Sequence, residues 1–147
     1  MRILDSDILS YALYDDSPAH VHAWQLLERG LLGEIDLHVT HTTILETYNV
    51  LYWFYRVRPL RSLLEKLSLT IEGLRVVETS MNGISISKTE NIPLGDGFLI
   101  ATALKHNKPI IVTNDSHIIN KAPKYGLLTD NPLPEDIRKK LSELKIE

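Results

Sequence analysis

The sequence has no cysteine and no long hydrophobic run, and each absence excludes several functions. Without cysteine the chain can form no disulfide, no thiolate zinc site and no cysteine nucleophile. No segment approaches the roughly 18 consecutive apolar residues of a membrane-spanning helix. Asp5 and Asp7 lie where a signal peptide would need its apolar core. We therefore expect a cytoplasmic protein that has no membrane segment.

The sequence also lacks an excess of positive charge. Its 16 Lys and Arg residues are outnumbered by 19 Asp and Glu residues, which gives a formal net charge of −3. Any contact with nucleic acid must therefore be local, because the whole surface cannot attract phosphate. The composition, 44% hydrophobic and 24% charged, is typical of a chain with a well-packed core. We expect one domain spanning residues 1–147.

Short apolar runs alternate with longer helical stretches, which predicts an α/β domain with a mainly parallel sheet. Strands are expected at residues 2–4, 37–40, 75–78, 109–113 and 127–128, and helices at 17–32, 44–55, 59–69 and 95–105 and from 134 onward. In the first of these helices, Ser17 and Pro18 fit the start, and Val21, Trp24, Leu27 and Leu31 should form the buried face. In residues 80–95, Ile84 and Ile86 alternate like a strand after an Asn82-Gly83 turn.

Four acidic residues hold similar positions along this pattern. Asp5 and Asp115 each follow an apolar strand, and Glu46 and Asp96 lie in the first turn of a helix. In a parallel sheet such positions converge at the carboxyl ends of the strands, where ligands usually bind. Clustered carboxylates repel one another unless a cation binds between them, and Mg²⁺ and Mn²⁺ prefer oxygen ligands. The pattern predicts a site for one or two such ions, which can activate water for attack on a phosphodiester.

Each acid also has a structural interpretation. Asp5 and Asp115 fit turn or cap positions, and Asp96 fits the start of its helix after glycine. Glu46 fits a capping box with Thr43. Capping and metal binding are compatible, because helix starts often lie at active-site crevices.

The acids lie in motifs that together resemble the PIN-domain family. The four motifs are Ile3-Leu4-Asp5-Ser6-Asp7, Thr43-Ile44-Leu45-Glu46, Asp96 to Ala103 and Val112-Thr113-Asn114-Asp115. Their order and spacing match the family over essentially the whole chain. The resemblance implies a three-layer α/β/α domain with a central, mainly parallel sheet. It also implies an endoribonuclease that depends on Mg²⁺ or Mn²⁺ and hydrolyses RNA with metal-activated water.

Carried over residue by residue, the resemblance makes Asp5, Glu46, Asp96 and Asp115 the catalytic, metal-binding acids. Ser6, Asp7 and Thr113 would support them. Small PIN domains resemble VapC-type toxins, so a cognate antitoxin and a homodimer are expected partners beside RNA. Asp7 and Gly97 depart from the family, which usually has Asn and Ala at these positions.

Other residues admit two interpretations. Arg56, Arg58 and Arg61 can contact RNA phosphates or an antitoxin, or form a solvated helix end. The neighbouring Trp53, Phe54 and Tyr55 can stack on bases, but their spacing favours core or dimer contacts. His117, two residues after Asp115, is the one histidine placed to touch substrate, although a surface role suits it better.

Two further functions remain as alternatives to the ribonuclease. One is a PIN-like module that binds RNA or protein without catalysis, against which stands the full set of four acids. The other is an aspartyl-phosphate phosphatase with Asp5 as nucleophile, suggested by the Asp5-Ser6-Asp7 sequence. That class also needs a lysine near the phosphate, which the sequence does not identify. Cleavage of DNA or flap structures is open as well.

Overall fold

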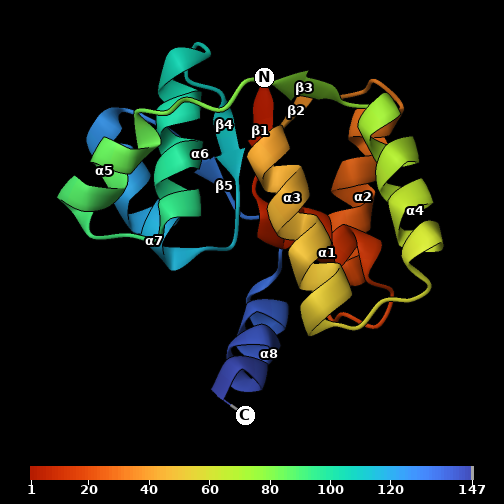
Figure 1. Cartoon of the computed structure of the whole chain (residues 1–147). Helices are drawn as coiled ribbons and strands as arrows, with labels where there is room; N and C mark the ends of the chain where they lie inside the picture. Colours follow the sequence, from red (N-terminus) through yellow and green to blue (C-terminus); the bar gives the residue numbers. More distant parts are fainter. Residues whose placement is uncertain (147) are drawn as a thin grey trace.

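Five parallel strands form the centre of the molecule (Figure 1). The computed structural model describes the backbone of residues 1–146 and the side chains of residues 1–144. The strands are β1 (Arg2–Leu4), β2 (Leu37–Thr40), β3 (Arg75–Val77), β4 (Ile110–Val112) and β5 (Thr129–Asp130), in the order β3-β2-β1-β4-β5. Every pairing is parallel, which confirms the predicted α/β class and parallel sheet.

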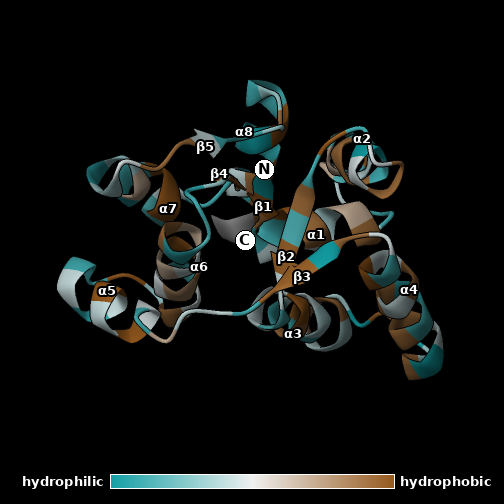
Figure 2. Ribbon diagram, turned by 90° about the horizontal axis from the view of Figure 1, so that it is seen from above, coloured by the Kyte–Doolittle hydropathy of each residue, from teal (hydrophilic) through white to brown (hydrophobic). Residues whose placement is uncertain are grey.

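Helices cover both faces of the sheet and make three layers, as Figure 2 shows from above. One side carries α1 (Ser6–Leu13), α2 (His20–Leu31), α3 (His41–Asn49), the π-helical turn η1 (Val50–Phe54) and α4 (Leu60–Glu72). The other carries α5 (Gly83–Glu90), α6 (Leu94–Lys105), α7 (Ser116–Lys121) and the 3₁₀ turn η2 (Ala122–Tyr125). The last helix, α8 (Glu135–Ile146), extends away from the body of the molecule (Figure 1).

Alternating strand residues build two cores. Leu4 and Val112 face the α1–α4 side, while their neighbours Ile3 and Ile111 face the α5–α7 side, and all four are fully buried. This alternation follows from the two-residue period of a strand. Because helices cover both sides, the central strands β1 and β4 are apolar apart from Arg2, whereas Arg75 and Val76 of the edge strand β3 are exposed.

The order of the strands places a crevice at their carboxyl ends. From β1 the chain moves outward through β2 to β3, then crosses to β4 and β5 on the other side of β1. The direction of winding therefore reverses between β1 and β4. Ligands bind at such a point in open α/β sheets, and Asp5 and Asp115 follow these two strands.

The sequence prediction missed two helices, α1 and α7, and was wrong about the segment that forms α5. Helix α1 begins directly after Asp5, where no helix was predicted. Residues Gly83–Glu90 form α5, although Ile84 and Ile86 alternate like a strand. Packing decides here, because α5 lies against α6 so closely that a Cβ at Gly83 would overlap the Phe98 backbone.

Helix α2 also differs from its prediction. It begins at His20 with Ala19 as its cap residue, and Ser17 instead accepts a hydrogen bond from the Ala19 N–H at 3.1 Å. Its buried residues are Ala23, Leu26, Leu27 and Gly30, whereas Val21 and Trp24 are exposed, so the predicted face is rotated. Glycine is required at position 30, because any Cβ there would overlap the Leu37 side chain of β2.

Two other elements differ slightly from the prediction. The last strand lies at Thr129–Asp130, not at 127–128, and the helix predicted at 44–55 ends in η1.

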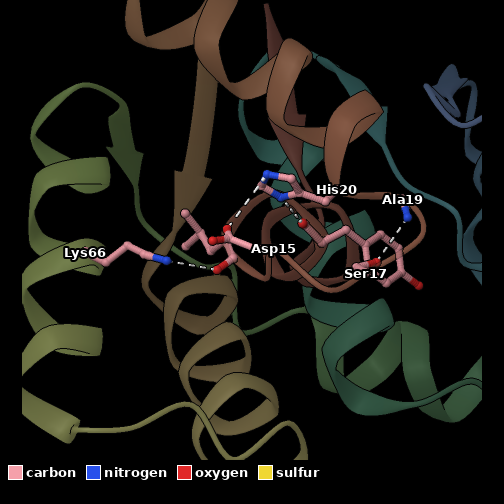
Figure 3. Close-up of polar contacts among 7 residues, drawn as sticks. Asp15, Ser17, Ala19, His20 and Lys66 are labelled. Atoms are coloured by element: carbon pink, nitrogen blue, oxygen red, sulfur yellow. Dashed lines mark hydrogen bonds and ion pairs between the residues drawn. The ribbon is translucent and has the colours of Figure 1, made fainter.

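Polar contacts hold the connection between α1 and α2 in place (Figure 3). His20 lies 3.8 Å from Asp15 and 3.2 Å from the Tyr11 carbonyl oxygen through its two ring nitrogens. From α4, Lys66 donates a hydrogen bond to the Leu13 carbonyl at 3.3 Å. These contacts fix the C-terminal end of α1, the helix that begins directly after Asp5.

Candidate active site

Asp5 is positioned by both elements that it joins. It follows β1 as the cap residue of α1, and its Oδ1 accepts a hydrogen bond from the Ser6 N–H at 2.7 Å. Its Oδ2 accepts a second hydrogen bond from the Thr113 hydroxyl at 2.7 Å. The Asp5 side chain is buried and therefore held in one orientation. Its capping role thus coexists with a place in the crevice.

Asp115 holds the equivalent position after β4. It caps α7, where its Oδ1 accepts from the His117 N–H at 2.8 Å. The Thr113 hydroxyl links the two acids, because it donates to Asp5 and accepts from the Asp115 N–H at 2.9 Å. Thr113 is fully buried. Its predicted supporting place beside the acids matches this geometry.

Asp96 approaches the same point from α6. It lies in the first turn of that helix, whose cap residue is Pro93, so Asp96 is not the cap. One carboxylate oxygen from each of Asp5, Asp96 and Asp115 lies within 4.8 Å of the others. The Asp96 Oδ2 is buried and has no hydrogen-bond partner among the described residues. An unpaired buried oxygen of this kind needs a partner from outside the chain.

Glu46 completes the group from α3. Thr40 caps this helix, because its hydroxyl oxygen accepts a hydrogen bond from the Thr43 N–H at 3.0 Å. The capping box expected between Thr43 and Glu46 therefore does not form the start of the helix. The Glu46 carboxylate lies against Gly95, where the Cβ of any other residue would overlap it. Gly95 therefore brings Glu46 next to Asp96, a role that sequence reasoning missed. The sequence did contain a signal for this role, because Gly95 directly precedes the predicted site residue Asp96.

The electrostatics of the crevice show that the four acids act on one another. Burial raises the pKa of Asp96 to about 8, assisted by the charges of Asp115, Asp5 and Glu46. Burial and the charges of Asp5 and Asp115 raise the pKa of Glu46 to about 7. Burial raises the pKa of Asp5 to about 6, although the Thr113 and Ser6 hydrogen bonds oppose this. Groups from four separate elements thus share one electrostatic site.

These features fit a hard divalent cation. The available donors are carboxylate oxygens alone, which suit Mg²⁺ or Mn²⁺ better than softer metals. A cation would compensate for the burial and the mutual repulsion of the carboxylates, which together raise the three pKa values, and it would give the unpaired Asp96 oxygen a partner. Asp5, Asp96 and Asp115 are placed to hold it, with Glu46 beside them.

Asp7 serves a different purpose from the four acids. Its Oδ2 accepts from the Asn114 N–H at 2.9 Å and its Oδ1 from the Ile8 N–H at 2.7 Å. Burial and the nearby Asp5 raise its pKa well above the ordinary value. Asp7 therefore ties α1 to the segment between Thr113 and Asp115. The Asn114 side-chain oxygen in turn accepts from the Asn131 amide at 2.8 Å, so both the backbone and the side chain of Asn114 are held.

The predicted basic cluster is not a uniform phosphate-binding surface. The Arg58 guanidinium stacks 3.6 Å from the centroid of the Tyr52 ring and donates a hydrogen bond to the Tyr52 carbonyl. The Arg61 Nε lies 3.4 Å from the Glu65 carboxylate, so both side chains already have partners within the chain. Arg56 is exposed and directly follows Tyr55 at the end of η1. The His117 side chain is exposed as well, in agreement with a surface position.

The chain was compared with known protein families and structures. Residues 2–124 match the PIN domain. The chain belongs to the PIN-domain family. The motifs quoted from the sequence therefore predicted the family correctly. PIN domains are generally nucleases, and no curated protein matches the sequence of this one.

Solved structures share the fold of this PIN domain at low identity. PAE2754 from Pyrobaculum aerophilum is 17% identical, with a TM-score of 0.63 over 99% of this chain and 96% of the other. A chain in the structure of FitAB bound to an IR36 DNA fragment is 22% identical, with a TM-score of 0.62 over 90% of this chain and 95% of the other. A chain of a toxin–antitoxin complex from Klebsiella pneumoniae is 15% identical, with a TM-score of 0.60 over 90% of this chain and 98% of the other.

Proposed function

We propose that this PIN domain is an endoribonuclease that requires Mg²⁺ or Mn²⁺ and hydrolyses RNA phosphodiester bonds with water. The observation that supports this most directly is the convergence of Asp5, Asp96 and Asp115 around an unpaired buried oxygen, with Glu46 beside them. Among the described residues, this site leaves the Asp96 Oδ2 without a hydrogen-bond partner. It therefore suits a cation and, through it, a phosphate.

The residues of the chain have separate tasks in this proposal. Asp5, Asp96 and Asp115 hold one or two ions, and Glu46 adds a fourth carboxylate that can orient or deprotonate water. Thr113 fixes Asp5, and Asp7 fixes the segment that leads to Asp115. When bound, the metal supplies Lewis acidity for the phosphate and a water of lowered pKa. The N–H groups of Ser6 and His117 stabilise the charged carboxylates in the crevice.

The biological role that we propose is that of a toxin with a cognate antitoxin. This rests on the PIN fold together with the similarity to a chain of a toxin–antitoxin complex. Cytoplasmic location and a homodimer belong to the same proposal. None of the helices in the described part of the chain is both long and apolar enough to cross a bilayer.

The first test is calorimetric titration with Mn²⁺ of the wild type, Asp5→Asn, Asp96→Asn and Asp115→Asn. We expect one shared site, so each substitution should weaken binding, while Asp16→Asn at an exposed position should not. Cleavage of single-stranded RNA should follow the same order, and a DNA strand of the same sequence tests the preference for RNA. Growth arrest of a bacterial host by the wild type, absent with Asp5→Asn, would support the toxin role.

If the wild type binds no Mn²⁺ with or without RNA, the alternative of a non-catalytic RNA- or protein-binding module takes precedence. The phosphatase alternative predicts a covalent phosphate on Asp5, which mass analysis after reaction with a phosphate ester would detect. The geometry does not favour it, because both Asp7 oxygens already accept backbone hydrogen bonds.

A further inference from the structure

The helix that carries Glu46 ends in a π-helical turn, and this turn exposes two large aromatic side chains. Thr43, Thr47 and Leu51 form the buried stripe of α3 and η1. In an uninterrupted α-helix Phe54 would continue that stripe, because it lies about three turns beyond Thr43. The π-turn, closed by the Tyr55 N–H donating to the Val50 carbonyl at 3.0 Å, shifts this register by one residue.

The shift turns Tyr55, which is half-buried, toward the core in place of Phe54. Tyr55 stacks on Tyr14 with ring centroids 4.1 Å apart, whereas Phe54 is 75% exposed and Trp53 is 61% exposed. Two adjacent aromatic rings in water are unfavourable unless something covers them. Single π-turns within helices are frequent at functional sites. The position of this one, which begins about one turn after Glu46, therefore indicates a binding surface.

Trp53 and Phe54 line a pocket that adjoins the acidic crevice. The pocket lies between α1 and η1, has a volume of about 570 Å³, and is also lined by Ser6, Asp7, Tyr11 and Asn49. In Figure 1 the yellow end of α3 and η1 lies beside α1, in agreement with this position. The Ser6 N–H donates to Asp5, so one wall of the pocket also belongs to the crevice.

The lining of this pocket suits a flat, polar-edged ligand. Aromatic rings offer faces for stacking, while the Ser6 hydroxyl and the Asn49 amide offer hydrogen bonds at the rim. Arg56, directly after the π-turn, adds an exposed positive charge close to a site that is otherwise acidic. Ring faces, hydrogen-bonding edges and a nearby cation are the groups that recognise a nucleotide in a single strand.

We propose that this pocket binds one unstacked nucleobase of a single-stranded RNA, adjacent to the phosphodiester that lies at the four acids. This inference rests on the proposed ribonuclease function and names its substrate as unpaired RNA. A base within a duplex cannot enter the pocket, because its faces are covered by its neighbours. Stacking on Trp53 or Phe54 would then position the backbone for cleavage.

The test uses Trp53 as its own reporter. The chain has two tryptophans, so Trp24→Phe leaves Trp53 as the only one. Asp96→Asn in the same chain prevents cleavage during the measurement. We expect a 12-nucleotide single-stranded RNA to quench Trp53 fluorescence saturably, and a duplex of the same sequence to have no such effect.

Substitutions in the Asp96→Asn background measure the contribution of stacking. Trp53→Leu and Phe54→Leu keep apolar bulk but remove the rings, and each should weaken single-strand binding by about tenfold, because the base then loses its stacking partner. Leu45→Ala, a similarly exposed position on α3 (60% exposed), is the matched control and should change nothing. With Asp96 intact, both aromatic variants should bind Mn²⁺ like the wild type.

Unchanged RNA affinity in both aromatic variants would overturn the proposal. So would a change in sedimentation behaviour without a change in RNA affinity, which would make this surface a contact between protein copies. Failure of catalysis is distinguishable from both results. A wild type that binds RNA through Trp53 and Phe54 but cleaves none would retain the nucleobase pocket and refute the ribonuclease.

Discussion

The hydroxyl group of Thr113 connects two acids that are 110 positions apart in the sequence. It donates to the Asp5 carboxylate and accepts from the Asp115 N–H, in a fully buried position. Thr113→Val keeps the shape of the side chain but leaves both groups unpaired. We expect the free energy of unfolding to fall by about 1–3 kcal/mol and Mn²⁺ affinity to fall by about 10–100-fold.

Denaturant unfolding and calorimetric titration measure the two effects of Thr113→Val. Thr113→Ser is the matched control, because it keeps the hydroxyl and should retain most of the Mn²⁺ affinity. Equal Mn²⁺ affinity in the valine variant and the wild type would show that this hydrogen bond does not orient the site.

Glu46 was expected in the first turn of a helix, but α3 begins at His41 and Glu46 lies in its second turn. The positions of Asp5 and Asp115 after two strands, and of Asp96 in the first turn of a helix, could be predicted from the sequence pattern. The contacts that hold them could not. Asp7 binds the Asn114 N–H across 107 residues, and Gly95 lies against Glu46 from another helix. Such pairings depend on how the elements pack, which no local pattern encodes.

At the scale of elements, the close approach of α5 and α6 explains two departures from expectation. A Cβ at Gly97 would overlap the Gly83 carbonyl, so alanine, which is usual in the family at this position, does not fit here. The other end of α5 is held by Glu90, whose carboxylate accepts from Lys124 at 2.8 Å and Tyr125 at 2.6 Å. Local alternation favoured a strand in this segment, but these distant contacts favour a helix.

Gly97→Ala tests this packing. Alanine favours a helix by up to about 1 kcal/mol, yet we expect a net loss of about 1–3 kcal/mol in unfolding free energy, because the overlap is with backbone. Gly73→Ala is the control, since its Cβ would meet chiefly the flexible end of the Leu31 side chain. Chemical denaturation of both variants measures the difference, and a more stable Gly97→Ala protein would refute close α5–α6 packing.

At the scale of the whole molecule, the alternation of apolar runs with helical stretches was enough to predict the parallel sheet, because its central strands β1 and β4 are buried between helices on both faces. Helix α1 and the π-turn η1 escaped prediction for different reasons. Helix α1 follows Asp5 without a separating loop, and its residues 8–13 are all buried, so no polar face marks it. The π-turn is visible only once Tyr55 has packed against Tyr14.

The acids come from elements on both sides of the sheet, so their charge affects the stability of the whole fold. The pKa values of Asp96 and Glu46 in the folded chain are about 8 and 7, above their ordinary values. Between about pH 4 and pH 8 the folded protein therefore binds more protons than the unfolded chain, and its stability falls as pH rises. Without metal, we expect the melting temperature to fall across this window.

Mn²⁺ should reverse that loss, because it binds the deprotonated acids and only the folded chain brings them together. At 100 times its dissociation constant, an ion adds about 2.7 kcal/mol, on the order of 5–10 °C in melting temperature. Asp96→Asn should flatten the pH dependence without metal and lose most of the Mn²⁺ response, while Asp16→Asn should behave like the wild type. Thermal melts at pH 5, 6.5 and 8, in chelator and in Mn²⁺, measure both effects. A wild type that becomes more stable from pH 5 to pH 8 in chelator would mean that the acids do not repel one another across the crevice, and the metal site would lose its electrostatic basis.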